Sequence, residues 1–211
     1  MGLARAAVLG LAAAWAPAVA QAHPHAWIDV TSTAIVDAHG RVEAIEQTWL
    51  FETLYTLFVT DTLKEDPRPE AEALRDMARQ NLGNLAEYDY FTVPKCTGAP
   101  AAVAPVRTFE TEMREGRLWL RFIVPLASPL PLAGAGFSYA IRDPTYFIDM
   151  RHEGPAAARV AGPGGDRCAA RVELPDPGPE AIARAAALDR DAVVEDALGD
   201  LFAERVVLTC D

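Results

Sequence analysis

The chain has 211 residues, of which 30 are acidic and 19 are basic, so its formal net charge is −11. A surface this acidic repels nucleic acid and anionic lipid and concentrates cations nearby, so we expect no nucleic-acid partner. Apolar residues make up 51% of the chain, which suffices for a sizeable core. The length suits one domain or a closely packed pair of subdomains.

The first 22 residues have the pattern of a secretory signal peptide. Arg5 precedes an apolar run at 6–19 that is too short to span a bilayer but suits a signal-peptide core. The small residues of Ala20-Gln-Ala22 then match what a signal peptidase accepts. We therefore predict a mature chain that begins at His23, has no membrane span and is periplasmic. An uncleaved membrane anchor is the alternative.

Export to an oxidising compartment favours a disulfide, and the chain has three cysteines, Cys96, Cys168 and Cys210. The sequence leaves all three single pairings open. We favour Cys168–Cys210, because this bridge would secure a C-terminus that otherwise frays. In the chain-entropy model such a loop contributes about 3–4 kcal/mol to stability.

The apolar pattern predicts an α+β fold, with antiparallel β-sheets and a few helices packed on one side, because runs of strands flank separate helices. Alternation over 26–36 places Asp29 on one face of a strand and Val30 on the other. The predicted strands cover 26–36, 42–51, 88–93, 108–114, 118–124, 136–141, 145–150 and 204–209, and the predicted helical segments cover 52–63, 70–85 and 176–199.

The strongest chemical feature is His23-Pro24-His25, because cleavage would give His23 a free α-amine. That amine and the His23 imidazole can chelate one metal ion, and His25 can add a second imidazole. Pro24 has no amide N–H, which disfavours a square-planar site made of backbone amides. This donor set suits a divalent transition metal ion, namely nickel, cobalt, zinc or copper. The alternative is a polar lead-in to the first strand.

Further ligands are predicted at Asp29, Asp149 and His152. Asp149 and His152 are close enough in sequence to bind one ion, or for the carboxylate to orient the imidazole. The alternative for His152 is an exposed loop position. A metal site shared by the two clusters is supported only if the fold brings His152 and His23 together.

Other familiar sites are missing from the sequence. The acidic stretch 61–72 has two prolines and no glycine, so it does not fit a calcium-binding loop. No phosphate-binding loop, dinucleotide fingerprint, HExxH motif or serine nucleophile elbow occurs. We therefore expect a protein that is not an enzyme.

Five motifs occur in order along nearly the whole mature chain and together resemble the DUF1007 family: His23-Pro-His-Ala-Trp-Ile-Asp29, Trp49-Leu-Phe-Glu52, Asn81-Leu-Gly-Asn-Leu85 followed by Tyr88-Asp-Tyr-Phe-Thr92, Asp143-Pro-Thr-Tyr146, and Leu198-Gly-Asp-Leu-Phe-Ala203 with Cys210. The resemblance implies a periplasmic component of an uncharacterised ABC-type transport system. It also implies association with nickel/cobalt or zinc transporters.

Two functional hypotheses follow. The first is a periplasmic metal-binding accessory or chaperone protein that presents a divalent ion to an inner-membrane metal transporter. The second is an interaction module of a transporter or export assembly that binds no metal. Its contact surface would be an exposed aromatic set, Trp49, Tyr88, Tyr90 and Tyr146.

Overall fold

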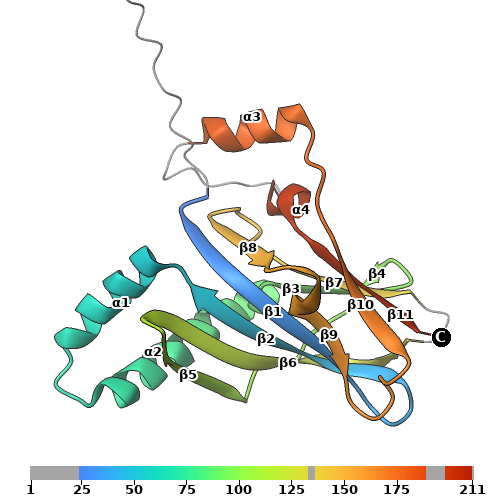
Figure 1. The fold of residues 1–211 in the computed structure, drawn as a ribbon, viewed down its shortest axis with the longest axis horizontal. Coiled ribbons are helices and arrows are strands. Elements are labelled where there is room, and N and C mark those ends of the chain that lie inside the picture. The colour runs from blue at the N-terminus through green and yellow to red at the C-terminus, as the bar shows by residue number, and fades with distance from the viewer. Residues whose placement is uncertain (1–23, 133–135, 189–197, 211) are drawn as a thin grey trace, which may run out of the picture.

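The structure is a computed structural model, and it describes residues 24–132, 136–188 and 198–210. The predicted signal peptide and His23 lie outside the described residues. Two β-sheets face each other, and the helices lie around them (Figure 1). This arrangement confirms the predicted α+β class.

The first sheet has the strand order β5-β6-β2-β1-β8, and β9 also pairs with β1. β1 forms antiparallel pairs with β2, whereas β8 and β9 run parallel to β1. The strand bounds are Ala26–Val36 for β1, Arg41–Phe51 for β2, Phe109–Arg114 for β5, Arg117–Pro131 for β6, Ile148–His152 for β8 and Ala158–Ala161 for β9.

The second sheet has the strand order β10-β11-β7-β3-β4. Its strands are β3 (Thr92–Cys96), β4 (Ala99–Pro100), β7 (Phe137–Ile141), β10 (Cys168–Glu173) and β11 (Arg205–Cys210). Cys168 and Cys210 are directly paired across β10 and β11, and they form a disulfide with a Cα–Cα distance of 4.0 Å. The predicted pairing is therefore confirmed, and Cys96 is a free thiol.

The helices form two pairs. α1 (Thr53–Lys64) and α2 (Glu70–Leu85) lie together near β5, and α3 (Pro179–Ala187) and α4 (Leu198–Phe202) lie apart from them (Figure 1). Two short 3₁₀ helices, η1 (Ala86–Phe91) and η2 (Pro155–Ala157), complete the fold. Within the described part of the chain, no helix is both long enough and apolar enough to cross a membrane.

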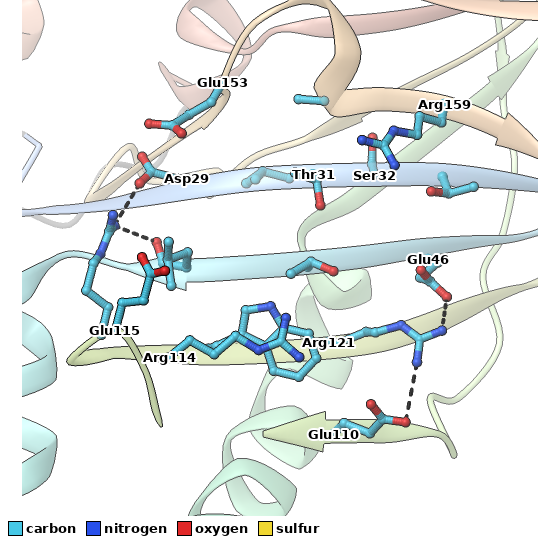
Figure 2. Close-up of a pocket in the computed structure, with 17 residues that line it drawn as sticks. Asp29, Thr31, Ser32, Glu46, Glu110, Arg114, Glu115, Arg121, Glu153 and Arg159 are labelled. Atoms are coloured by element: carbon cyan, nitrogen blue, oxygen red, sulfur yellow. Dashed lines mark hydrogen bonds and ion pairs between the residues drawn. The ribbon is translucent and has the colours of Figure 1, made fainter. Parts of the chain in front are cut away.

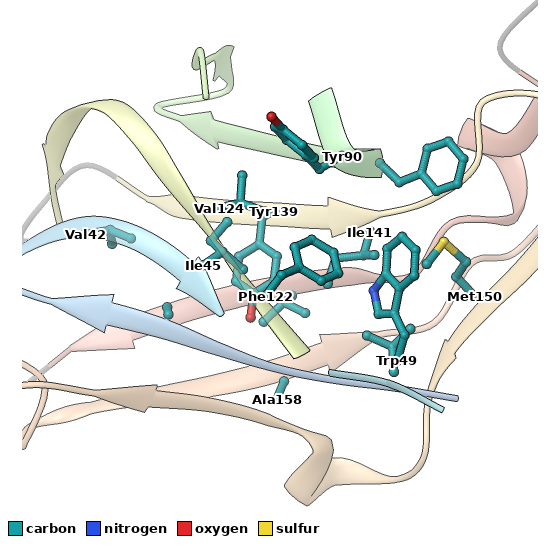
Figure 3. Packing of buried hydrophobic residues seen from close by; sticks show 14 of the residues in the cluster. Val42, Ile45, Trp49, Tyr90, Phe122, Val124, Tyr139, Ile141, Met150 and Ala158 are labelled. Carbon is teal, nitrogen blue, oxygen red and sulfur yellow. The ribbon is translucent and has the colours of Figure 1, made fainter. Parts of the chain in front are cut away.

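The main core lies between the inner faces of the two sheets (Figure 3). As the alternation predicted, Ile28 and Val30 of β1 are buried, whereas Asp29 faces the other side. Phe122 of the first sheet is fully buried, as is Phe137 of the second, so the core draws on both sheets. Burial of these apolar side chains supplies the main driving force for their packing.

The predicted strand over 88–93 is wrong in its first part. Asp89, Tyr90 and Phe91 all have positive φ angles, between 53° and 57°, and extended structure begins only at Thr92. Such a left-handed turn is costly for residues other than glycine, so tertiary contacts must stabilise it. One such contact is the backbone N–H of Val106, which donates to the Tyr90 hydroxyl at 3.0 Å.

Other boundaries also differ from the prediction. β9 and β10 were not predicted, and β8 begins three residues later than the predicted strand at 145–150. The predicted helical segment 176–199 contains α3 and the start of α4, and its residues 189–197 lie outside the described part.

Candidate functional site

The predicted metal ligands that the structure describes lie in separate places. On the outer face of the first sheet, the carboxylate of Asp29 pairs with the guanidinium of Arg117 at 2.7 Å (Figure 2). The same guanidinium group donates to the backbone carbonyls of Leu50 and Phe51, at 3.1 and 2.7 Å. Asp29 is therefore engaged in an ion pair that links β1 to the start of β6.

Asp149 and His152 do not converge either. They are three residues apart on β8, and residues at this spacing point to opposite faces of a strand. The carboxylate of Asp149 is buried and pairs with Arg151 at 2.7 Å. Among the described residues, no group of three His, Cys, Asp or Glu side chains is placed to hold a metal ion.

His152 instead belongs to a buried hydrogen-bonded network between the sheets. Its Nδ1 lies 2.9 Å from Oε2 of Glu204, and its backbone N–H donates to the same oxygen at 2.7 Å. On its other side, Nε2 lies 2.8 Å from the Ser32 hydroxyl, which lies 2.8 Å from the Tyr139 hydroxyl. Burial raises the pKa of Tyr139, whereas the hydrogen bond with Ser32 opposes this rise.

The order Ser32–His152–Glu204 matches that of a serine hydrolase triad. A triad serine must be open to its substrate, but Ser32 is only 2% exposed. The network instead links β1, β7 and β8 to the residue before β11, and it gives every polar side chain in it a partner. Its role is thus to hold the two sheets together, since buried polar groups are costly without partners.

His25 lies at the start of β1, where it lines a surface hollow of about 480 Å³. Its backbone N–H donates to the carbonyl of Phe147 at 2.8 Å, and the two rings are 4.8 Å apart. Glu52 and Asp61 line the same hollow. The lining of this hollow therefore includes one imidazole and two carboxylates, although the three groups are not close enough together to hold one metal ion by themselves. Neither carboxylate is among the ligands predicted from the sequence.

The rest of the hollow is apolar. Leu54, Leu57 and Phe58 occupy one face of α1 and are 71%, 55% and 68% exposed, and Phe147 beside them is 42% exposed. We call these four residues the α1 patch. A contiguous exposed apolar surface of this kind is typical of a site that binds another protein or a membrane. Their helical spacing is visible in the sequence, but it does not reveal that this face is left exposed by the residues that the structure describes.

The predicted aromatic contact surface is wrong for three of its four residues. Trp49, Tyr90 and Tyr146 are buried, with exposed fractions of 2%, 5% and 8%, and Tyr88 is half exposed. Trp49 packs edge-on against Phe122 in the main core, with ring centroids 4.9 Å apart. Aromatic side chains bury a large apolar area, which favours their burial in strands and turns alike.

The outer face of the first sheet forms a hollow of about 910 Å³ (Figure 2). Its charges are mostly compensated within the face. The Arg121 guanidinium bridges Glu46 and Glu110, and the hydrogen bond with Glu46 raises the pKa of Arg121. The Arg114 guanidinium covers the ring of Trp119 at 3.3 Å. Glu115, Glu153 and Arg159 line the same hollow outside these ion pairs, so the lining as a whole holds five carboxylates and four guanidinium groups of nearly balanced charge.

The fold and the hollow define an α+β protein built on two facing sheets, with a disulfide at its C-terminus and an exposed apolar helix beside its first strand. The chain belongs to the DUF1007 family, whose description is "protein of unknown function" and whose model matches residues 8–210. An uncharacterized protein of Haemophilus influenzae is 25% identical over 192 residues, which cover 90% of this chain and 92% of that protein. No solved structure matches the chain.

Proposed function

We propose that this chain is an exported accessory protein of a transition-metal transport system. It binds a divalent ion, nickel, cobalt, zinc or copper, at its terminal histidines and presents the ion to an inner-membrane transporter. The metal is its cargo, and the protein acts by binding rather than by catalysis.

The observation that carries this proposal is the position of His25, which shares one surface hollow with Glu52, Asp61 and the α1 patch. The Glu52 carboxylate accepts a weak hydrogen bond from the Trp27 backbone N–H at 3.4 Å, and Asp61 pairs with Lys64 at 2.7 Å in an exposed position. Exposed carboxylates of this kind can exchange such partners for an ion at little cost. Imidazole and carboxylate donors suit the metals named above.

The ligand set differs from the one the sequence suggested. Asp29, Asp149 and His152 each have another engaged partner, so we assign them structural roles. The proposed site consists of the amine and imidazole of His23 and the imidazole of His25. Glu52 and Asp61 are the carboxylates that line the same hollow as His25.

The α1 patch gives the proposal a docking surface beside the metal site. A transporter that covers Leu57 and Phe58 would bury apolar side chains and bring its own metal ligands close to His25. The Cys168–Cys210 disulfide is compatible with a location outside the cytoplasm, where such bonds persist. Periplasmic location and cleavage before His23 complete the proposal.

Calorimetric titration of the mature protein with Ni²⁺, Cu²⁺ and Zn²⁺ tests the terminal chelate. One extra glycine before His23 removes the free amine from that residue, and we expect affinity for at least one of the metals to fall by about tenfold or more. His25→Ala should also weaken binding. His39→Ala is the matched control, because His39 lies in an exposed turn on another part of the chain. Equal affinity in all four proteins would remove the terminal site.

A second candidate, an interaction module that binds no metal, is favoured by the α1 patch alone. Leu57→Glu places a charge in this patch, so it should abolish binding to the transporter under either hypothesis. Chelator treatment and His25→Ala separate the two. Transporter binding that neither of them changes supports the second candidate and contradicts the first.

A further inference from the structure

A different cavity, of about 220 Å³, lies between the inner face of the first sheet, α1, α2 and η1. Trp49 and Phe91 are its most deeply buried aromatic residues, whereas Phe51 and Tyr55 are partly buried and stack at 4.9 Å. Leu85 of α2 completes this apolar surround. The cavity therefore has a predominantly apolar lining, both aromatic and aliphatic, that is separate from the outer face of the sheet.

Among the residues that the structure describes, no charged side chain lines this cavity, although the chain carries a net charge of −11. Burial raises the pKa of the Tyr55 phenol, so this group also stays neutral at physiological pH. An ionised ligand would lose its hydration there without gaining a counter-charge, which is strongly unfavourable. The lining therefore selects for an uncharged ligand.

Two carboxamides mark the open side of the cavity. Asn81 and Asn84 both line it, and both are exposed residues of α2. At a spacing of three residues they share one face of the helix. Neither side chain has a hydrogen-bond partner in the described part of the chain, and each carboxamide can both donate and accept. They can therefore hold one polar group of a ligand whose apolar part lies inside.

The inner wall of the cavity includes a residue with a strained backbone conformation. Phe91 is the last of the three left-handed residues and stacks on Trp49 with a ring distance of 6.1 Å. Trp49 is held in turn, because its indole N–H donates to Gln47 at 2.9 Å. Backbone strain of this kind persists where surrounding contacts fix it, often at ligand sites. These contacts hold the two rings of the inner wall in place.

We propose that this cavity binds a small uncharged molecule that has one ring or a short aliphatic chain and a single hydroxyl or amide group. The apolar part packs between Trp49, Phe91 and Tyr55, and the polar group meets Asn81 and Asn84. The size agrees, because an apolar cavity of about 150 Å³ already holds benzene. His25 does not line this cavity, although Ala26 and Tyr55 line both it and the hollow at His25, and either proposal can fail without the other.

Fluorine NMR of the mature protein with para-fluorobenzyl alcohol tests the proposal. We expect a saturable change in the fluorine signal. The affinity for para-fluorobenzoate should be lower by at least about tenfold, because its carboxylate finds no cation in the cavity. Asn84→Phe should block the opening and reduce binding by a similar factor. Gln80→Phe is the matched control, since Gln80 is exposed on α2 but does not line the cavity.

A double variant, Asn81→Leu with Asn84→Leu, isolates the polar contact. Both positions are exposed, and leucine favours helix, so the fold should be kept. This variant should lose its preference for para-fluorobenzyl alcohol over para-fluorotoluene while it still binds the toluene. The proposal is overturned if no saturable binding occurs, if Asn84→Phe and Gln80→Phe bind alike, or if the benzoate binds as well as the alcohol.

Discussion

Removing the Glu204 side chain tests the buried network most directly. Oε2 of Glu204 accepts two hydrogen bonds from His152, one from the backbone N–H and one at Nδ1. Both residues are buried, so water cannot replace the lost acceptor without opening the interface between the sheets. Glu204→Ala therefore leaves two buried donors without a partner.

The magnitude follows from these two donors. Each buried donor without an acceptor costs about 1–3 kcal/mol, and breaking a buried pair by removing one partner costs about 3–5 kcal/mol. We expect Glu204→Ala to lower the free energy of unfolding by about 3–5 kcal/mol, a large part of the about 5–15 kcal/mol typical of a domain. Glu204→Gln keeps one acceptor oxygen and should cost about 1–2 kcal/mol.

The assay is urea unfolding of the mature protein with its disulfide intact, followed by tryptophan fluorescence. Trp49 lies in the main core and reports the loss of packing. Glu43→Ala is the matched control, because Glu43 is exposed on β2 and has no side-chain partner in the described part of the chain. A loss below about 1 kcal/mol for Glu204→Ala would refute the claim that this network holds the sheets together.

Two further predictions concern the disulfide and one surface carboxylate. Cys168 and Cys210 are 42 residues apart in sequence. Replacing both by alanine should lower the free energy of unfolding by about 4 kcal/mol in the chain-entropy model. Urea unfolding measures this loss, and an unchanged free energy would contradict the bridge. Hydrogen bonds from Arg68 lower the pKa of Asp66 from 3.8 to about 2. The stability that Asp66 contributes should be complete above pH 3.8 and be lost as the pH falls towards 2, and Arg68→Ala should return the pKa, measured by carbon NMR, towards 3.8. Identical titration in both proteins would exclude Arg68 as the cause.

Local patterns predicted the regular elements best. The predicted bounds of β1 and α2 coincide with the structure, because strict alternation and helical spacing are readable from neighbouring residues. The segment 88–93 failed for a tertiary reason. Its aromatic residues favour a strand, but the contact of the Tyr90 hydroxyl with Val106, distant in sequence, helps hold a left-handed turn there.

The residues of the candidate site also separate into those that the sequence indicated and those that it did not. The predicted Cys168–Cys210 pair is confirmed, whereas His25 as a metal ligand stays a prediction from the terminal His-Pro-His pattern. The sequence did not predict that Glu52 and Asp61 would share a hollow with His25. Whether carboxylates meet an imidazole depends on how α1 leaves the end of β2, which no local pattern specifies.

The sequence by itself determined the acidic composition, the α+β class and most strand and helix positions, because these depend on residue type and short-range periodicity. Only the tertiary structure decided which side of each element is covered. It placed Trp49 in the core and left Leu57 exposed, although both are apolar residues in regular elements. It also paired His152 with Glu204, 52 residues away, because partners for buried polar groups are chosen by the packing of the two sheets.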